Sequence, residues 1–313
     1  MKLIKKTTKI DFLSKARRRT ALMISAFLII ASIGSLATRG LEFGIDFTGG
    51  ILLEVGYPQA ANLEQIRGNL GAAGFSDAQV QRFGRDTDVL VRLPPQPGTE
   101  ADEVRTELQR ILQANGDLIE LRRVEFVSAQ VGSELAERGA LATVIALLMI
   151  FMYVMIRFQW KFSAGAVAAL AHDAIVTVGF FSWFGLPFDL TVVAAVLAVI
   201  GYSLNDTVVA FDRIRENFFT LRGATADDAM NTSINEMLAR TLITGLTTLL
   251  VLAALLVLGG ESIAPFSIAL IVGIIIGTYS SIYTASATAL ELNVNVQDLI
   301  EPIKDPSLID DLP

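Results

Sequence analysis

Residues 201–217 have the sequence GYSLNDTVVAFDRIREN and end the long apolar run that begins at Leu190. An uncompensated aspartate near the middle of a membrane-spanning helix costs about 2.5–3.5 kcal/mol, so the presence of Asp206 needs an explanation. The charged residues from Asp212 onward mark where this helix leaves the hydrocarbon. Asp206 lies seven residues before Arg213, which places it roughly 10 Å deeper along the helix. The sequence therefore predicts a carboxyl group well inside a membrane.

The composition of the 313-residue chain is that of a membrane protein. Apolar residues make up 52% and charged residues 18%, whereas the charged share of soluble domains is about 25%. The absence of cysteine excludes disulfides and thiolate metal sites, and a single histidine excludes a multi-histidine metal centre. The sequence has no P-loop and no dinucleotide glycine motif. We therefore expect no metal, no other cofactor and no enzymatic activity.

Charge is distributed unevenly along the chain. Residues 1–19 hold eight Lys or Arg against one Asp, while the tail after Ala289 holds six Asp or Glu against Lys304. Basic residues beside an apolar span stay on the cytoplasmic side of a membrane. A nucleic-acid site would also be basic, but the adjacent span favours the membrane interpretation. With an even number of spans, both chain ends are expected in the cytoplasm.

The first apolar segment, residues 20–38, is long enough to cross a core of about 30 Å at 1.5 Å per residue. A cleaved secretory signal is the alternative, because Ser35-Leu36-Ala37 has small residues at the spacing of a cleavage site. An uncleaved span is favoured because it places the later loops consistently. Five further spans are predicted in a bundle at residues 137–290, followed by an acidic cytoplasmic tail at 291–313; the spans are 141–156, 162–184, 190–211, 238–258 and 266–290.

Two segments outside the spans differ in character. Residues 212–235 form a charged cytoplasmic segment, and an amphipathic stretch at 227–237 is a candidate for a helix lying along the membrane surface. Residues 39–136 instead show scattered charges, Pro-rich turns and alternating apolar residues, which indicates a soluble domain on the outer side.

The soluble domain is predicted to have the element order β-α-β-β-α-β, which is the ferredoxin-like order of a four-stranded sheet with two helices on one face. Nothing in it is typical of a catalytic site, so packing or partner binding is the simplest role. The predicted strands are 51–56, 78–82, 88–93 and 118–127, and the predicted helices are 62–73 and the segment from a Thr99 cap to 113. The predicted fold class is thus a polytopic α-helical membrane protein with six transmembrane helices and one exported α+β domain between helices 1 and 2.

Arg240 begins the fifth predicted span, about 6 Å beyond Glu236. Two interpretations of this arginine remain open. It is either an interfacial arginine that snorkels to the headgroups, or an ion-pair partner for Asp206. Because both residues lie toward the cytoplasmic half, on spans that are joined on that side, an ion pair at similar depth is geometrically open.

His172 and Asp173 lie near the centre of the third predicted span, about 18 Å beyond Lys161. The default interpretation of His172 is a polar side chain satisfied by neighbouring helices. Carboxylates inside membrane proteins are usual elements of a proton or ion path, and a histidine titrates near neutral pH. Asp173 is therefore a candidate for such a path.

Two further motifs have simpler explanations. Gly273 and Gly277 in the last span form a small-xxx-small face, which indicates close helix packing. The triplet Asn205-Asp206-Thr207 matches a glycosylation sequon, but its position inside a span excludes that use.

Four stretches together resemble the SecD/SecF family of protein-export membrane proteins, which is related to the resistance-nodulation-division transporters, and within it the SecF-like members. The resemblance covers nearly the whole chain, including the order of one span, one exported domain and five spans. The matching stretches are FGIDFTGG at 43–50, which contains Gly44, Asp46, Gly49 and Gly50, AHD at 171–173, the quoted stretch at 201–217, and residues 238–248.

The resemblance implies a function in protein translocation across the bacterial cytoplasmic membrane. SecF-like proteins pair with SecD and assist export through the SecYEG channel after the ATP-driven motor SecA has acted, with small accessory membrane subunits as further partners. The pair couples inward movement of protons, or of sodium, to motion of the exported domains. By this analogy Asp206 carries the proton and Arg240 is its switchable partner. Asn205, Thr207 and His172 then give support, with Asp173 a further candidate.

Two other functions stay open at this point. A non-transporting scaffold of the translocon would hold a partner near the channel through the exported domain, and would tolerate loss of the charges at Asp206 and Arg240. A solute exporter of the wider superfamily would have a lipid or drug pocket and two tandem repeats, of which only one is present.

Overall fold

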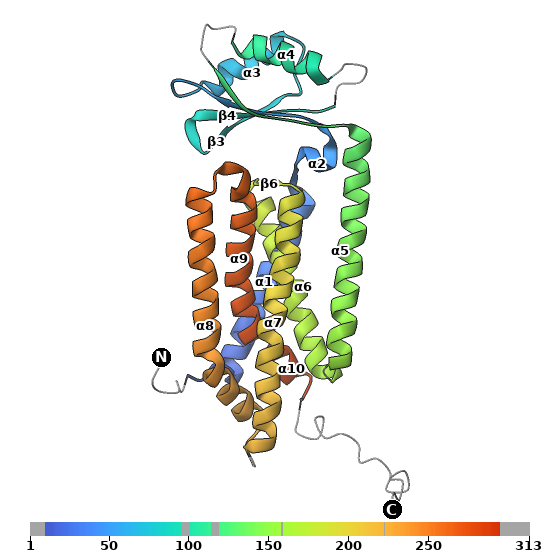
Figure 1. Ribbon diagram of the computed structural model, residues 1–313. Helices are drawn as coiled ribbons and strands as arrows, with labels where there is room; N and C mark the ends of the chain where they lie inside the picture. Colours follow the sequence, from blue (N-terminus) through green and yellow to red (C-terminus); the bar gives the residue numbers. More distant parts are fainter. Residues whose placement is uncertain (1–9, 96–100, 114–118, 158, 222, 295–313) are drawn as a thin grey trace, which may run out of the picture.

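The computed structural model of the protein describes residues 10–95, 101–113, 119–157, 159–221 and 223–294. The predicted Thr99 cap, the first nine basic-end residues and the tail beyond residue 294 lie outside these ranges. The described chain consists of a helical bundle and a smaller α+β domain stacked on one end of it (Figure 1).

Six helical stretches within the described residues are long and apolar enough to cross a membrane, as the sequence predicts. They run side by side (Figure 1). The first residues of α1 and the last residues of the sixth stretch both lie at the side of the bundle that is opposite the sheet. The chain is therefore a multi-pass membrane protein. The six stretches are α1 (Lys15–Thr38), α5 (Ala129–Arg157), α6 (Trp160–Phe184), α7 (Leu190–Thr220), α8 (Ala226–Leu258), and a last one made of α9 (Ala264–Ser280), the π-helical η2 (Ser281–Ala285) and α10 (Ser286–Glu291).

Several helices continue well past the predicted spans. Helix α7 extends through the charged residues to Thr220, and the stretch 227–237 is not a separate surface helix but the first turns of α8. The Thr225 side chain caps α8 by accepting from the Asp228 amide, and two aspartates in the first turn complement the helix dipole. These caps stabilise a helix start outside the apolar segment.

The soluble domain contains a four-stranded antiparallel sheet with the strand order β3-β4-β2-β5. Its chain order is strand, helix, strand, strand, helix, strand, and α3 and α4 cover the face of the sheet that points away from the bundle (Figure 1). Leu53, Val91 and Leu108 are fully buried in the core between sheet and helices. The elements are β2 (Gly50–Gly56), α3 (Leu63–Ala72), β3 (Gln79–Phe83), β4 (Arg85–Leu93), α4 (Ala101–Leu112) and β5 (Glu120–Val127).

Four short elements lie where the domain meets the bundle. The strand β1 (Glu42–Phe43) pairs in parallel with β6 (Pro187–Phe188), and the single-turn helix α2 (Ile45–Thr48) follows β1 directly. A 3-10 turn, η1 (Glu261–Ile263), precedes α9. The β1–β6 pair connects the segment after α1 to the loop between α6 and α7.

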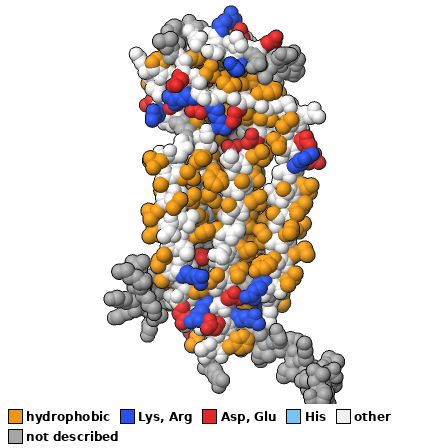
Figure 2. All heavy atoms as spheres, viewed as in Figure 1, with side chains coloured by type: hydrophobic (Ala, Val, Ile, Leu, Met, Phe, Trp, Pro, Cys, Tyr) orange, Lys and Arg blue, Asp and Glu red, His pale blue; other side chains and the backbone are white. Residues whose placement is uncertain are grey.

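The surface of the bundle is mainly apolar between two charged ends. Figure 2 shows hydrophobic side chains along the sides of the bundle, with Lys, Arg, Asp and Glu gathered over the soluble domain and toward the opposite end. Helix α5 is the least enclosed of the six membrane-spanning stretches. Only 6% of its most apolar stretch is buried inside the protein, whereas the share for α6 is 56%. This distribution fits an environment of lipid or other membrane helices around the bundle.

Candidate functional site

Helix α7 directs three polar side chains into the bundle within little more than one turn. Ser203 and Thr207 are fully buried, and Asp206 is 9% exposed. Because residues three or four apart lie on the same side of a helix, these side chains form one polar strip in an otherwise apolar helix. Asn205, by contrast, lies on the exposed side.

Asp206 faces α8, where its partner is a threonine that the sequence did not single out. The Thr241 hydroxyl lies near the Asp206 carboxylate, and Arg240 acts on the carboxylate by electrostatic attraction. Thr241 is buried, whereas the Arg240 side chain is exposed. No ion pair joins Arg240 to any of the described residues. The predicted pair is thus near in space but not in direct contact in this state.

Polar contacts outside the apolar region hold α7 and α8 together. Arg213 Nε donates to Glu236 Oε2 at 2.7 Å, and Asn217 Nδ2 donates to the same oxygen at 2.8 Å. Asn217 Nδ2 also donates to Ser233 Oγ at 2.9 Å. These bonds join the charged ends of the two helices that carry Asp206 and Arg240.

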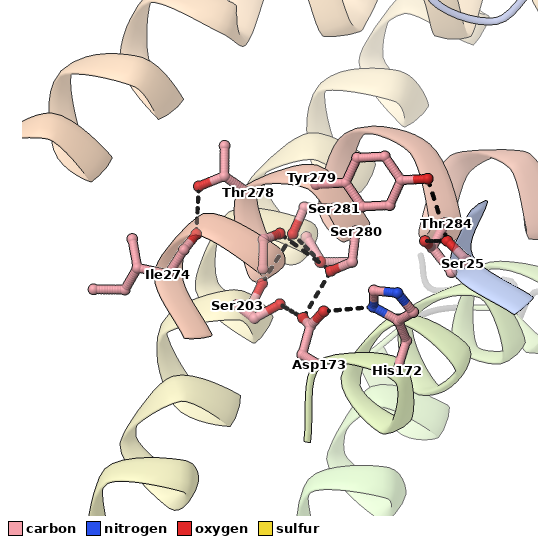
Figure 3. A network of polar contacts seen from close by, with 12 residues as sticks. Ser25, His172, Asp173, Ser203, Ile274, Thr278, Tyr279, Ser280, Ser281 and Thr284 are labelled. Carbon is pink, nitrogen blue, oxygen red and sulfur yellow. Dashed lines mark hydrogen bonds and ion pairs between the residues drawn. The ribbon is translucent and has the colours of Figure 1, made fainter. Parts of the chain in front are cut away.

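Asp173 is fully buried in α6 and is the centre of a hydrogen-bond network (Figure 3). Its Oδ2 accepts from Ser203 Oγ of α7 at 2.6 Å and from Ser280 Oγ of α9 at 2.7 Å. Both hydroxyl groups donate to the same carboxylate oxygen. The carboxyl group therefore links three helices at one point.

His172 is also fully buried and lies beside this carboxyl group. Its Nδ1 is 3.0 Å from Asp173 Oδ1, and its ring centroid is 6.1 Å from that of Tyr279. His172 Nε2 is buried and has no hydrogen-bond partner in the described structure. His172 is therefore linked to the network through Asp173.

The last membrane segment changes to a π-helix where it meets the network. Ser281 is the first residue of this π-helix. Its Oγ lies 2.9 Å from Thr207 Oγ1 and also donates to the Ser203 carbonyl at 3.4 Å. Thr284 Oγ1 lies 2.9 Å from Ser25 Oγ of α1. Such π-helical turns are rare and occur frequently at functional sites. The polar network thus extends from α7 through the last segment to α1.

Close packing of glycines brings the last segment against α7, as the small-xxx-small pattern predicts. A Cβ atom built on Gly273 would lie 2.1 Å from Val199 Cγ2, and one on Gly277 would lie 3.2 Å from Ser203 Cβ. Only glycine fits at Gly273 without movement of the neighbouring helix. This approach allows the short Ser280 side chain to reach Asp173.

The stretch at residues 43–50 lies at the other end of α7 and not beside Asp206. Asp46 Oδ2 accepts from the backbone amide of Leu190, the first residue of α7, at 3.0 Å. Leu190 and Asp206 are separated by 16 positions (206 − 190), which is about 24 Å along a helix. The predicted site residues therefore form three groups: Asp206 with α8, Asp173 with His172 and Thr207, and the glycine-rich stretch with Asp46.

Sequence reasoning missed Ser203, Ser280, Ser281 and Thr241. A signal for the two adjacent serines exists, because Ser280 and Ser281 interrupt an apolar run shortly after Gly277. Among the described residues there is no group of three or more His, Cys, Asp or Glu that could hold a metal ion. What the arrangement can do chemically is to bind and release protons at buried carboxyl groups.

Two family models match the chain. One, described as protein export membrane protein SecD/SecF, C-terminal, covers residues 107–295, and the other, described as the SecD/SecF GG motif, covers residues 34–61. The protein translocase subunit SecF of Vibrio alginolyticus is 49% identical over 94% of this chain and 95% of its own length. That of Pseudomonas aeruginosa is also 49% identical, over 95% of this chain and 96% of its own.

Two solved structures are similar to the whole chain. SecDF from Thermus thermophilus, described as a translocon-associated membrane protein, has a TM-score of 0.84 at 36% identity. SecDF in a super-membrane-facing form has a TM-score of 0.67, also at 36% identity. In both cases the match covers 94% of this chain and 40% of the solved chain. The present chain thus spans less than half the length of these structures.

Proposed function

Because this chain belongs to the SecD/SecF family of protein-export membrane proteins, we propose that it acts as a SecF-type protein translocase subunit in the bacterial inner membrane. Its partner is SecD. The matched curated proteins carry the name of this subunit, and the solved SecDF chains have additional length that a separate SecD would supply. The complex assists passage of unfolded polypeptides through the SecYEG channel, after the motor SecA and alongside small accessory membrane subunits, and the subunit itself is not an enzyme.

Both chain ends are proposed to lie in the cytoplasm, with the α+β domain at residues 39–136 on the outer side. The basic residues at 1–19 support this orientation. The strand order β3-β4-β2-β5, with two helices on one face, supports a ferredoxin-like assignment for the domain. The domain is then in a position to contact a polypeptide that leaves the channel.

The observation that carries the proposal is the environment of Asp206. This carboxyl group is buried in a membrane helix, next to a hydroxyl group and near a guanidinium group. A buried carboxylate that takes up a proton loses its attraction to a nearby cation. A proton that crosses 100 mV releases about 2.3 kcal/mol, which is enough to shift a two-state equilibrium substantially.

In the proposed cycle, Asp206 takes up a proton and its hold on Thr241 and Arg240 weakens. Helices α7 and α8 then shift relative to each other, and the shift moves the soluble domain. Arg240 is exposed in this state, so it has room to approach Asp206 in another. Two solved SecDF forms match this chain with different TM-scores at the same identity, which supports more than one arrangement of such chains.

The network around Asp173 has a supporting role in this proposal. It connects Thr207, the neighbour of Asp206, to His172 through serines of α7 and of the last segment. Asp173 and His172 form a second place where a proton can reside. Asn205 is exposed and keeps only the role of nearby support for Asp206 that the resemblance implies.

The test is export of a precursor protein into membrane vesicles that contain the full chain with SecD, measured with the proton motive force present and after its collapse by an ionophore. The wild type is expected to export faster with the proton motive force, and Asp206→Asn and Arg240→Ala to lose that acceleration. Asp212→Asn is the matched control. Asp212 lies on the same helix, but in the charged part of α7, where it pairs with Arg157 at 2.6 Å. Full acceleration in Asp206→Asn would contradict the proposal and favour a non-transporting scaffold.

A further inference from the structure

The start of α7 is tied to the segment that leads into the soluble domain. Asp46 accepts a hydrogen bond from the Leu190 amide at 3.0 Å. The first amide groups of a helix have no partner within it, and a carboxylate at that end also complements the helix dipole. Asp46 comes from α2, a different part of the chain, so this bond joins two elements that are more than a hundred residues apart in sequence.

Backbone pairing and aromatic packing support the same junction. Phe43 lies opposite Phe188 in the β1–β6 pair, and the Gly44 amide donates to the Phe188 carbonyl at 2.8 Å. The ring centroids of Phe43 and Phe47 each lie 6.2 Å from the ring centroid of Phe188. The segment before the domain is therefore held against the loop that enters α7.

Glycine is required where this segment turns into the sheet. Gly50 has a φ of +119°, and a Cβ atom there would lie 2.1 Å from the Leu93 carbonyl oxygen. Gly49 has a φ of +70°, and a Cβ atom on Gly132 of α5 would lie 2.7 Å from the Gly49 amide nitrogen. A side chain at Gly50 would push β4 away, and one at Gly132 would push α5 away, so the glycines allow these elements to approach the segment closely.

An arginine from the sheet reaches into the junction. Arg92 Nη1 of β4 donates to the Phe43 carbonyl at 2.8 Å. Burial lowers the pKa of Arg92, while the nearby carboxylates of Glu42, Asp189 and Asp46 act in the opposite direction. Arg92 and Asp46 both line a cavity of about 220 Å³ between the sheet and the bundle. The sheet therefore contacts the segment before the domain by a charged side chain.

We propose that residues 42–50 form a mechanical joint that passes movement of α7 to the soluble domain, with Asp46 as its positioning residue. Helix α7 runs without interruption from Leu190, which Asp46 holds, to Asp206 and beyond. A continuous helix moves as one rod, so a shift at Asp206 displaces its starting end. The joint rests on the proposed function, because it transmits the movement that protonation of Asp206 is proposed to cause.

The test measures the distance between the domain and the bundle in the full chain assembled with SecD. The chain has no cysteine, so two spectroscopic labels can be placed at chosen sites. Gly68→Cys in α3 has open space around the new side chain, and Leu258→Cys at the end of α8 is 82% exposed. The label distance is recorded in vesicles with and without an imposed proton gradient.

We expect the gradient to change the label distance in the wild type, and Asp46→Ala to abolish most of that change. Asp46→Asn should restore it, because the amide oxygen can still accept from Leu190. Asp189→Ala is the control for the cap of α7, since among the described residues the Asp189 side chain accepts hydrogen bonds only from Thr191 and Val192 of α7 itself. If Asp46→Ala does not assemble in the membrane, Asp46→Glu, whose longer side chain alters the spacing, replaces it in the comparison with Asp46→Asn.

The outcomes separate the joint from the proposed function. The joint alone is overturned if the label distance responds to the gradient in the wild type, does not respond in Asp206→Asn, and still responds fully in Asp46→Ala or Asp46→Glu. A wild-type distance that does not respond to the gradient overturns the proposed function, and the joint with it. Loss of the response in both Asp46→Ala and Asp189→Ala would show a general effect of the α7 cap and would also overturn the specific role of Asp46.

Discussion

Asp206 was identified from the sequence because a lone acid in an apolar helix is costly, and that argument needs no structure. Its neighbour Thr241 on α8 was not predictable in the same way. Thr241 follows Arg240 directly, but a threonine in a helix can also satisfy its hydroxyl group with a carbonyl of its own helix. Thr244, Thr247 and Thr248 on α8 do so. The sequence does not distinguish these cases, because the rotation of α8 decides which threonine faces α7.

Replacement of Thr241 by valine should therefore reduce proton-driven export. A hydrogen bond to a charged group contributes about 1.5–3 kcal/mol, and each 1.4 kcal/mol corresponds to about tenfold. We expect the acceleration by the proton motive force to fall about tenfold in Thr241→Val, measured as the rate of precursor export into vesicles.

Thr244→Val provides the control for this measurement. The Thr244 hydroxyl donates to the Arg240 carbonyl of the same helix at 3.0 Å and its side chain is exposed. It should export as the wild type does. Equal export rates in Thr241→Val and Thr244→Val would mean that Thr241 has no part in the response of Asp206.

The serines around Asp173 illustrate the same limit. Asp173 and His172 were candidates from the sequence because charged or titratable groups are rare inside a membrane. The hydroxyl groups of Ser203 and Ser280 became recognisable only with the structure, since serines are common where helices pack closely. Sequence reasoning thus finds the acid in a buried network more readily than the groups that solvate it.

At the scale of elements, the six membrane helices were predictable because crossing a membrane requires about 20 apolar residues. The ends of α7 and α8 were not, because both helices continue into charged sequence, where caps and ion pairs decide the length. The π-helical turn at Ser281–Ala285 was also not predictable. It lies where the last segment meets the network around Asp173 and has no signature in local composition.

The contact between α9 and α7 gives a prediction at this scale. Alanine at Gly273 would place a Cβ atom 2.1 Å from Val199 Cγ2, so one of the two helices must move. Overpacking of this kind costs about 1–3 kcal/mol. We expect Gly273→Ala to lower the melting temperature of the purified protein in detergent, measured by intrinsic fluorescence.

Gly201→Ala is the matched control on α7, because no atom lies within 4 Å of the new Cβ. Alanine is the better helix former by about 1 kcal/mol, so this variant should melt at the same temperature as the wild type or slightly above it. The packing argument would be wrong if Gly273→Ala melted at or above the temperature of Gly201→Ala.

At the scale of the whole molecule, one helix relates the three groups of candidate residues. Helix α7 begins at the bond from Leu190 to Asp46, contributes Ser203 to the Asp173 network, and presents Asp206 to α8. The chain order predicted that these stretches belong to neighbouring spans. The approach of residues 42–50 to the start of α7 was not predictable, because it depends on how the sheet is seated on the bundle.

The central claim is that Asp206 carries the proton that drives the movement. The most direct measurement is proton flux into vesicles that contain the chain with SecD, recorded with and without a translocating polypeptide. The account predicts flux that increases with the polypeptide in the wild type and falls to the background of empty vesicles in Asp206→Asn. Flux of wild-type size in Asp206→Asn would contradict the account.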